Sequence, residues 1–128
     1  PLEVTFHRAF DRCKDPFEAL EQLIEIGCQR ILTSGQQLTA PKGIGLITQL
    51  VNSANERLII MPGSGVRIEN IKEIAEKTGA KEFHSSLRGK KNSQMNFIHP
   101  CFAEGMESYV NPAIDPDEVK ALRRALYP

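Results

Sequence analysis

Four short apolar runs, each ending in small or polar residues, constrain the fold of this sequence more than any other feature. They begin at Val4, Ile31, Ile59 and Glu82, so the steps between them are 27, 28 and 23 residues. The segments between the runs carry apolar residues at helical spacing. This alternation predicts four βα units around a parallel sheet, with strands at residues 3–6, 30–33, 58–61 and 82–85.

The boundaries of the expected helices are marked by turn-forming residues. Asp15-Pro16 and Asp115-Pro116 each place an N-cap before a proline at the first helical position, and Gly27 supplies a left-handed end for the first helix. A further helix is expected to stop near Gly79. The inward faces are expected to carry Phe17, Leu20, Leu23 and Ile24; Ile44, Ile47, Leu50, Val51 and Ala54; Ile68, Ile71, Ile74 and Ala75; and Val119, Leu122 and Leu126.

Two α/β architectures fit this pattern, namely a compact flavodoxin-like open sheet and a (β/α)8 TIM-type barrel. The regular step and the equal, short strands favour the barrel, which usually needs about 250 residues. The 128 residues hold four units, about half of that fold, so residues 1–128 are expected to form a single partial domain. Because Pro1 leads almost directly into a strand, we expect the natural polypeptide to extend further upstream.

The pattern breaks between Leu87 and Pro112. This stretch is polar, and residues 87–112 are predicted to form an extended βα loop. Loops of this length are often functional.

Composition argues against several classes of function. The 16 basic and 16 acidic residues leave no net charge, whereas a nucleic-acid-binding domain usually carries a basic excess. No apolar stretch approaches the ~18 residues of a membrane span, and no secretory signal is visible at the N-terminus. The cysteines Cys13, Cys28 and Cys101 are odd in number and widely spaced, which is typical of free thiols in a cytoplasmic protein. We therefore expect no nucleic-acid or membrane partner.

His7, Arg8 and Asp11 follow the first strand and are candidate catalytic residues. Histidine titrates near neutral pH, and a carboxylate can orient it for acid–base work. Arg8 is suited to clamping a carboxylate or phosphate. Alternatively, Arg8 and Asp11 form an ion pair that only holds the loop.

Gly63, Ser64 and Gly65 lie between a strand and a helix N-terminus, where backbone N–H groups can bind an anion. Thr33, Ser34 and Gly35 follow the second strand and offer hydroxyl groups to the same ligand. The alternative is that each set only shapes a tight turn.

Two further histidines are candidates for separate roles. His84, at the end of the fourth run, is a second acid–base candidate, with a satisfied core histidine as the alternative. His99 and Cys101 contain soft donors suited to Cu(I). A single His-x-Cys pair is not a metal signature, because the second pair of ligands is absent.

Four segments resemble the CutC family, which is named for copper homeostasis. They are residues 5–11, 30–35, 60–66 and 82–86, which occur in family order within residues 2–88. The resemblance implies a cytoplasmic (β/α)8 barrel, dimeric, of which this chain covers about the C-terminal half. It also implies a role in copper tolerance, with Cu(I) as the candidate cofactor.

Two hypotheses of function follow. The first is a copper-handling protein that binds Cu(I) directly. The second is a barrel enzyme for a small anionic or phosphorylated metabolite, with His7 and His84 as acid–base residues and the loop at Gly63 as the anion site. In either case we expect the open edges of the half-barrel to be closed by a second copy or by a missing N-terminal half.

Overall fold

A computed structural model describes residues 2–97, 99–102 and 110–127 of the chain. Its centre is a parallel sheet with the order β1-β2-β3, formed by β1 (Thr5–Phe6), β2 (Arg30–Thr33) and β3 (Ile59–Pro62). Phe6 lies opposite Ile31, which lies opposite Ile60, so these three side chains share one face. The predicted mixed α/β fold with a parallel sheet is confirmed.

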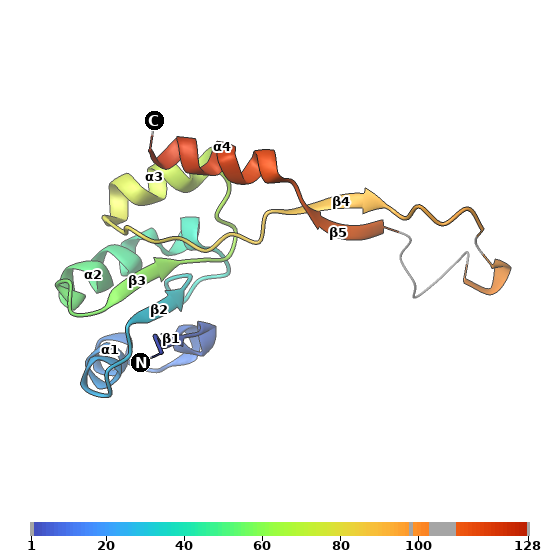
Figure 1. Ribbon diagram of the computed structural model, residues 1–128. Coiled ribbons are helices and arrows are strands. Elements are labelled where there is room, and N and C mark those ends of the chain that lie inside the picture. The colour runs from blue at the N-terminus through green and yellow to red at the C-terminus, as the bar shows by residue number, and fades with distance from the viewer. Residues whose placement is uncertain (1, 98, 103–109, 128) are drawn as a thin grey trace.

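The three helices α1 (Pro16–Glu25), α2 (Ile44–Ala54) and α3 (Ile68–Thr78) alternate with the strands (Figure 1). Asp15 caps α1 as predicted, because its Oδ1 accepts hydrogen bonds from the N–H groups of Phe17 and Glu18 at 2.9 and 3.0 Å. Gly27 and Gly79 adopt the left-handed conformation, with φ of +80° and +72°. Two short 3-10 helices, η1 (Arg8–Arg12) and η2 (Ala40–Gly43), occupy the loops after β1 and β2.

All three helices pack on the same face of the sheet. One buried cluster joins Ile31 and Ile60 to apolar residues of each helix. These are Leu20 and Leu23 of α1, Ile47 and Leu50 of α2, and Ile71 and Ile74 of α3. On the other face, Leu32, Ile59 and Met61 remain only half-buried.

The fourth predicted strand does not form. Residues 82–85 have no strand conformation, although the His84 N–H donates to the Pro62 carbonyl at 2.9 Å beside β3. Phe83 packs against the core from this segment. In the described residues this backbone hydrogen bond links the segment to β3, and a single bond does not make a strand ladder.

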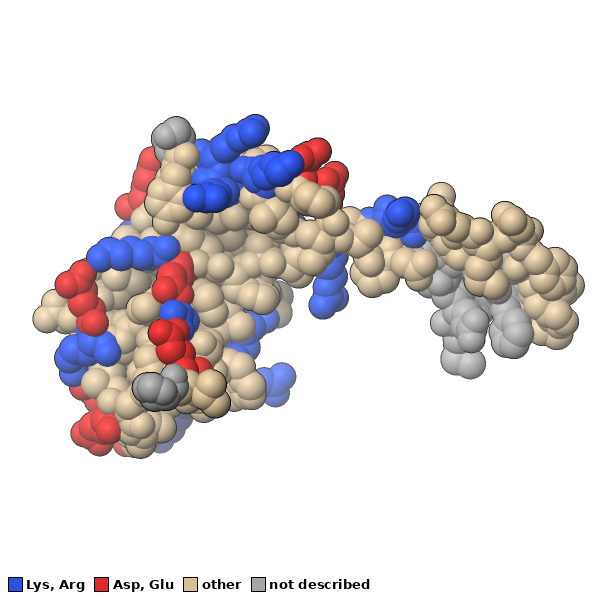
Figure 2. Space-filling view, in the orientation of Figure 1, with Lys and Arg blue, Asp and Glu red and all other residues tan. Residues whose placement is uncertain are grey.

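After residue 87 the chain leaves the parallel sheet and its helices as an antiparallel two-stranded ribbon. Residues 87–112, predicted to be an extended loop, contain β4 (Arg88–Asn92), η3 (Pro100–Phe102) and the start of β5 (Val110–Ile114). The ribbon projects away from the sheet and helices (Figure 1), and basic side chains gather on it and over α4 in the view of Figure 2. The last helix, α4 (Pro116–Leu126), returns to pack against α3.

Two residues expected on inward helix faces are exposed. Phe17 is 39% exposed, because α1 lies beside the edge strand β1, where no further helix of the described chain covers its flank. Val119 is 46% exposed, since α4 packs on α3 and not directly on the sheet. No helix in the part of the chain that the structure describes has the length and apolar character needed to cross a membrane.

Candidate functional site

The carboxyl ends of the three parallel strands meet at one edge of the sheet, where ligand sites of parallel α/β folds occur. The segments that follow them are η1 after β1, the loop 34–43 after β2 and the loop 63–67 after β3. Most of the predicted site residues lie here. The structure thus brings together groups that are 26 residues apart in the sequence, such as Arg8 and Ser34.

Asp11 accepts most of the hydrogen bonds that hold this edge together. Its side chain is 8% exposed and pairs with Arg8 Nε at 2.7 Å. Thr33 Oγ1 donates to Asp11 Oδ1 at 2.5 Å, and Ser34 Oγ donates to Oδ2 at 3.0 Å. The backbone N–H groups of Ser34 and Gln36 also donate to this carboxylate. Asp11 therefore ties η1 to the loop after β2.

The same contacts set the protonation of Asp11. Burial by itself would raise the pKa of the carboxyl group. Hydrogen bonds from Thr33, Arg8, Gln36 and Ser34 outweigh burial, and the pKa lies below its ordinary value of 3.8. Asp11 is consequently held as a carboxylate whose oxygens accept hydrogen bonds from four residues.

Arg8 extends the network outward. Its Nη2 donates to Ser34 Oγ at 2.7 Å and to the Gln37 carbonyl at 3.4 Å. The side chain nevertheless remains 42% exposed. The loop-holding ion pair considered as the alternative is present, and the exposed part of the guanidinium still faces solvent.

His7 caps η1, because its Nδ1 accepts a hydrogen bond from the Ala9 N–H at 3.0 Å. In the neutral ring the proton therefore resides on Nε2. The residue is exposed and extended, and it follows Phe6, whose side chain faces the core. Strand alternation directs His7 to the opposite face of the sheet, together with Leu32 and Met61.

The Thr33-Ser34-Gly35 turn lies close to the start of α2. Gly35 has φ +68°, and a Cβ on it would press against the Gly43 backbone. A Cβ on Gly43 would in turn overlap the Ser34 carbonyl. Both glycines are thus required for the close approach of the two backbones.

The Gly63-Ser64-Gly65 loop packs against the loop after β2. Ser64 Oγ donates to the Leu38 carbonyl at 3.0 Å, and the Ala40 N–H donates to the Ser64 carbonyl at 2.9 Å. Ser64 has φ 75° and Gly65 has φ 73°. The left-handed backbone of Ser64 is uncommon for a residue with a side chain and is typical of functional sites.

His84 is exposed and lies beside this loop. A Cβ on Gly63 would collide with Leu32 Cδ1 and would come within 3.3 Å of His84 Cβ. The neighbouring Ser85 Oγ donates to the Val66 carbonyl at 2.7 Å, which holds the segment against the start of α3. The alternative of a buried core histidine is wrong.

The structure does not bring the candidate copper ligands to this edge. His99 and Cys101 lie beyond β4, where the Cys101 N–H donates to His99 Nδ1 at 3.2 Å, and both residues are exposed. Among the described residues, no group of three or more His, Cys, Asp or Glu side chains is placed to hold a metal ion. Cys13, Cys28 and Cys101 are free thiols, as the sequence predicted.

Gln36 and Gln37 belong to the site although they were not singled out in the sequence. Gln36 contributes a backbone N–H to Asp11 and an amide group that donates to the Cys13 carbonyl at 2.8 Å. The Gln37 carbonyl lies 2.5 Å from Ser34 Oγ and competes with Asp11 Oδ2 for the single hydroxyl hydrogen. The polar character of residues 36–41 was the available signal, but backbone contacts of this kind do not depend on the type of side chain.

Comparison with known proteins gives a consistent result. Residues 1–89 match the model of the CutC family. A family protein CutC of Parabacteroides distasonis is 64% identical over 97 residues, which cover 76% of this chain and 40% of the relative. A family protein CutC of Chromobacterium violaceum is 43% identical over 129 residues, which cover 98% of this chain and 52% of the relative.

A solved structure agrees with the sequence relatives. The crystal structure of CutC from Streptococcus agalactiae, a protein provisionally named for copper homeostasis, superposes with a TM-score of 0.62 at 38% identity. The match covers 65% of this chain and 41% of that protein. The chain thus spans about half the length, or less, of the relatives that it matches.

Proposed function

The chain belongs to the CutC family, and we propose that it contributes to copper homeostasis as part of a cytoplasmic (β/α)8 barrel. The name of the Streptococcus agalactiae relative supports the role in copper homeostasis. The observation that supports the barrel is the packing of α1, α2 and α3 on a single face of a parallel sheet. A flavodoxin-like sheet would carry helices on both faces, whereas a barrel encloses its second face.

The proposed barrel needs further strands, because both edges of the sheet lie open. The edge at β1 and the segment 82–85 beside β3 are the two surfaces to be joined. Four further βα units close such a barrel, whether they come from a second copy or from an N-terminal half. In this arrangement the chain is the C-terminal half, and Leu32, Ile59 and Met61 point into the barrel.

We propose that the site at the strand ends binds a small anionic or phosphorylated metabolite. The arrangement of the loop 63–65 carries this proposal: its left-handed backbone leads into α3, whose N-terminus favours an anion. Arg8 offers a partly exposed guanidinium at the same edge. His7 and His84 are the acid–base candidates, because both are exposed beside these groups.

Titration of the chain with inorganic phosphate, followed by NMR, tests the anion site. We expect saturable shifts of the amide signals of residues 63–67. Substitution of Gly63 by alanine is expected to weaken binding, because the new Cβ meets Leu32 and His84. Gly45→Ala is the matched control, since a Cβ there meets no atom within 4 Å. Unchanged signals in the loop at high phosphate would refute the proposal.

Direct copper binding is the second candidate function. The contact between the Cys101 N–H and His99 Nδ1 favours it, because it places a thiol and an imidazole in one exposed turn. This pair would supply two soft donors to Cu(I). Titration against a chromogenic Cu(I) chelator tests it. Submicromolar binding that is lost in Cys101→Ser and in His99→Ala supports direct binding, whereas Cys13→Ser is the control. Absence of Cu(I) binding by the unmodified chain would rule it out.

A further inference from the structure

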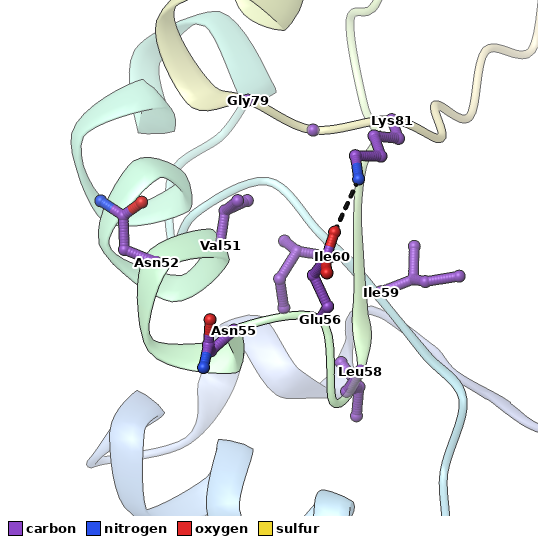
Figure 3. Close-up of a pocket in the computed structure, with 10 residues that line it drawn as sticks. Val51, Asn52, Asn55, Glu56, Leu58, Ile59, Ile60, Gly79 and Lys81 are labelled. Carbon is purple, nitrogen blue, oxygen red and sulfur yellow. Dashed lines mark hydrogen bonds and ion pairs between the residues drawn. The ribbon is translucent and has the colours of Figure 1, made fainter.

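A cavity in the described chain lies at the end of the sheet opposite to the candidate site. It has a volume of about 450 Å³ and opens between the C-terminal end of α2, the start of β3 and residues 79–81 (Figure 3). Pockets of about 300–1,000 Å³ are typical of small-molecule sites. The size of this cavity suits a metabolite of modest size, and the proposed function does not use it.

The interior of this cavity is apolar. Leu58 and Ile60 are 4% and 3% exposed and Ala80 is 9% exposed, so they form a buried floor. Val51 of α2 adds a half-buried aliphatic side chain to the wall. An aliphatic or aromatic group of a ligand would therefore replace water against this surface at a gain in free energy.

The mouth of the cavity carries one charge of each sign. Lys81 Nζ and a Glu56 carboxylate oxygen form an ion pair at 2.8 Å, which joins the segment after α3 to the loop before β3 (Figure 3). The two side chains are 79% and 84% exposed. Exposed pairs of this kind contribute little to stability, so the pair can open to admit a ligand at small cost.

The backbone that carries Glu56 has an uncommon conformation. Asn55 and Glu56 both have positive φ, of 46° and 60°. Asparagine tolerates the left-handed region, but glutamate is found there much less often. The turn directs the Glu56 side chain to the mouth, and Asn55 lies on the rim.

We propose that this cavity binds a zwitterionic amino acid with an apolar side chain. The apolar floor would hold the side chain, the Glu56 carboxylate would bind the α-ammonium group, and the Lys81 ammonium would bind the α-carboxylate. A ligand with both charges replaces both halves of the ion pair. A ligand with one charge would leave either Glu56 or Lys81 without its partner.

The test is isothermal titration calorimetry of the 128-residue chain with L-leucine. Two comparators of the same shape are 4-methylpentanoate, which lacks the ammonium group, and isoamylamine, which lacks the carboxylate. We expect saturable leucine binding, and weaker binding of each comparator by about two- to fivefold, since each loses one exposed ion pair.

Two variants locate the binding to this cavity. Glu56→Gln and Lys81→Met are each expected to weaken leucine binding by about two- to fivefold. The matched control is Lys77→Met, which removes a similar exposed pair with Glu73 at 2.6 Å on α3; neither residue lines the cavity. All three positions are exposed, and thermal unfolding verifies that each variant is folded.

Several outcomes would overturn the proposal. They are the absence of saturable leucine binding, equal binding of leucine and 4-methylpentanoate, and unchanged affinity in both charge variants. NMR signals of the residues that line the cavity are followed as the protein concentration is raised without ligand. If these signals shift with protein concentration but do not respond to leucine, a second copy of the chain covers this surface. None of these outcomes affects the phosphate or copper tests, because those concern other parts of the chain.

Discussion

Asp11 is the residue on which the loops at the strand ends depend. It accepts hydrogen bonds from Thr33, Ser34 and Gln36 and is paired with Arg8, and its side chain is almost completely enclosed. A buried carboxylate with this many donors holds the loops at the strand ends together, whereas His7 and His84, the proposed acid–base residues, are exposed. Arg8 links this network to solvent, because one side of its guanidinium holds Asp11 and the rest is exposed.

We expect Asp11→Asn to destabilise the chain by about 2–4 kcal/mol. The neutral amide loses the ion pair with Arg8, and its NH₂ group faces hydrogen-bond donors from which it cannot accept. The free energy of unfolding in urea measures this loss. Glu21→Gln is the control, since it removes an exposed pair with Arg57 at 2.7 Å. Equal stability of the two variants would contradict the central role of Asp11.

The lowered pKa of Asp11 predicts the direction of the pH dependence. The folded state holds the proton less tightly than the unfolded state, so the unfolded state binds more protons as the pH falls. The contribution of Asp11 to the free energy of unfolding is complete at pH values above the ordinary carboxyl pKa of 3.8. It is lost as the pH falls below 3.8 and through the lower pKa of the folded state. Urea unfolding between pH 2 and 6 should show a smaller acid-dependent loss in Asp11→Asn. Parallel curves for the two proteins would refute the assignment.

At the scale of elements, the loop after β2 depends on two facing glycines. A side chain at Gly43 would overlap the Ser34 carbonyl. We expect Gly43→Ala to destabilise the chain by about 2–3 kcal/mol, the cost of forcing backbone apart in a packed region. Gly45→Ala, two residues later in α2, should stabilise it by up to about 1 kcal/mol, because alanine favours helix and its Cβ meets nothing. Thermal unfolding of the two variants gives the comparison, and similar melting temperatures would contradict it.

Arg30 connects elements that are distant in the sequence. It pairs with Glu3 before β1 at 2.5 Å and with Glu82 after α3 at 2.6 Å. We expect Arg30→Met to increase hydrogen exchange at the His84 amide, because the segment 82–86 loses its link to β2. The control is Arg57→Met, which breaks a surface pair elsewhere. Unchanged exchange at His84 in Arg30→Met would show that the backbone bond to Pro62 alone holds this segment.

At the scale of the whole molecule, one face of the sheet remains uncovered. Leu32, Ile59 and Met61 are only half-buried there, and the strand edges are open, which is a common cause of association. We therefore expect the isolated chain to self-associate.

Met61→Lys is expected to reduce this association, because it places a charge on the uncovered face. Sedimentation velocity over a range of concentrations measures the effect. Ile26→Lys is the control, since Ile26 is 78% exposed at the end of α1. A stable, cooperatively folding monomer of the unmodified chain would contradict both the association and the half-barrel.

Local patterns predicted the elements well where the neighbours of each element are present. Asp15, Gly27 and Gly79 act at the helix ends as expected, and β2 has the predicted bounds. The strand prediction at residues 82–85 was wrong, because in the described residues a single backbone hydrogen bond, from His84 to Pro62, links this segment to β3 and does not make a ladder. The site was predicted as a set of strand-end residues, but its organisation around Asp11 was not, since hydrogen bonds from backbone N–H groups leave little trace in side-chain type.

The sequence by itself determined the order of the βα units, the edge of the sheet where polar groups gather and the resemblance to CutC proteins. These depend on local spacing, capping and short motifs, which act within a few residues. Only the tertiary structure decided which sheet face the helices cover, which partners Asp11 takes and where the cavity beneath Glu56 and Lys81 opens. Those features depend on contacts between segments about 20 to 50 residues apart, such as Asp11 with Thr33 and Arg30 with Glu82, and they exist only once the chain is packed.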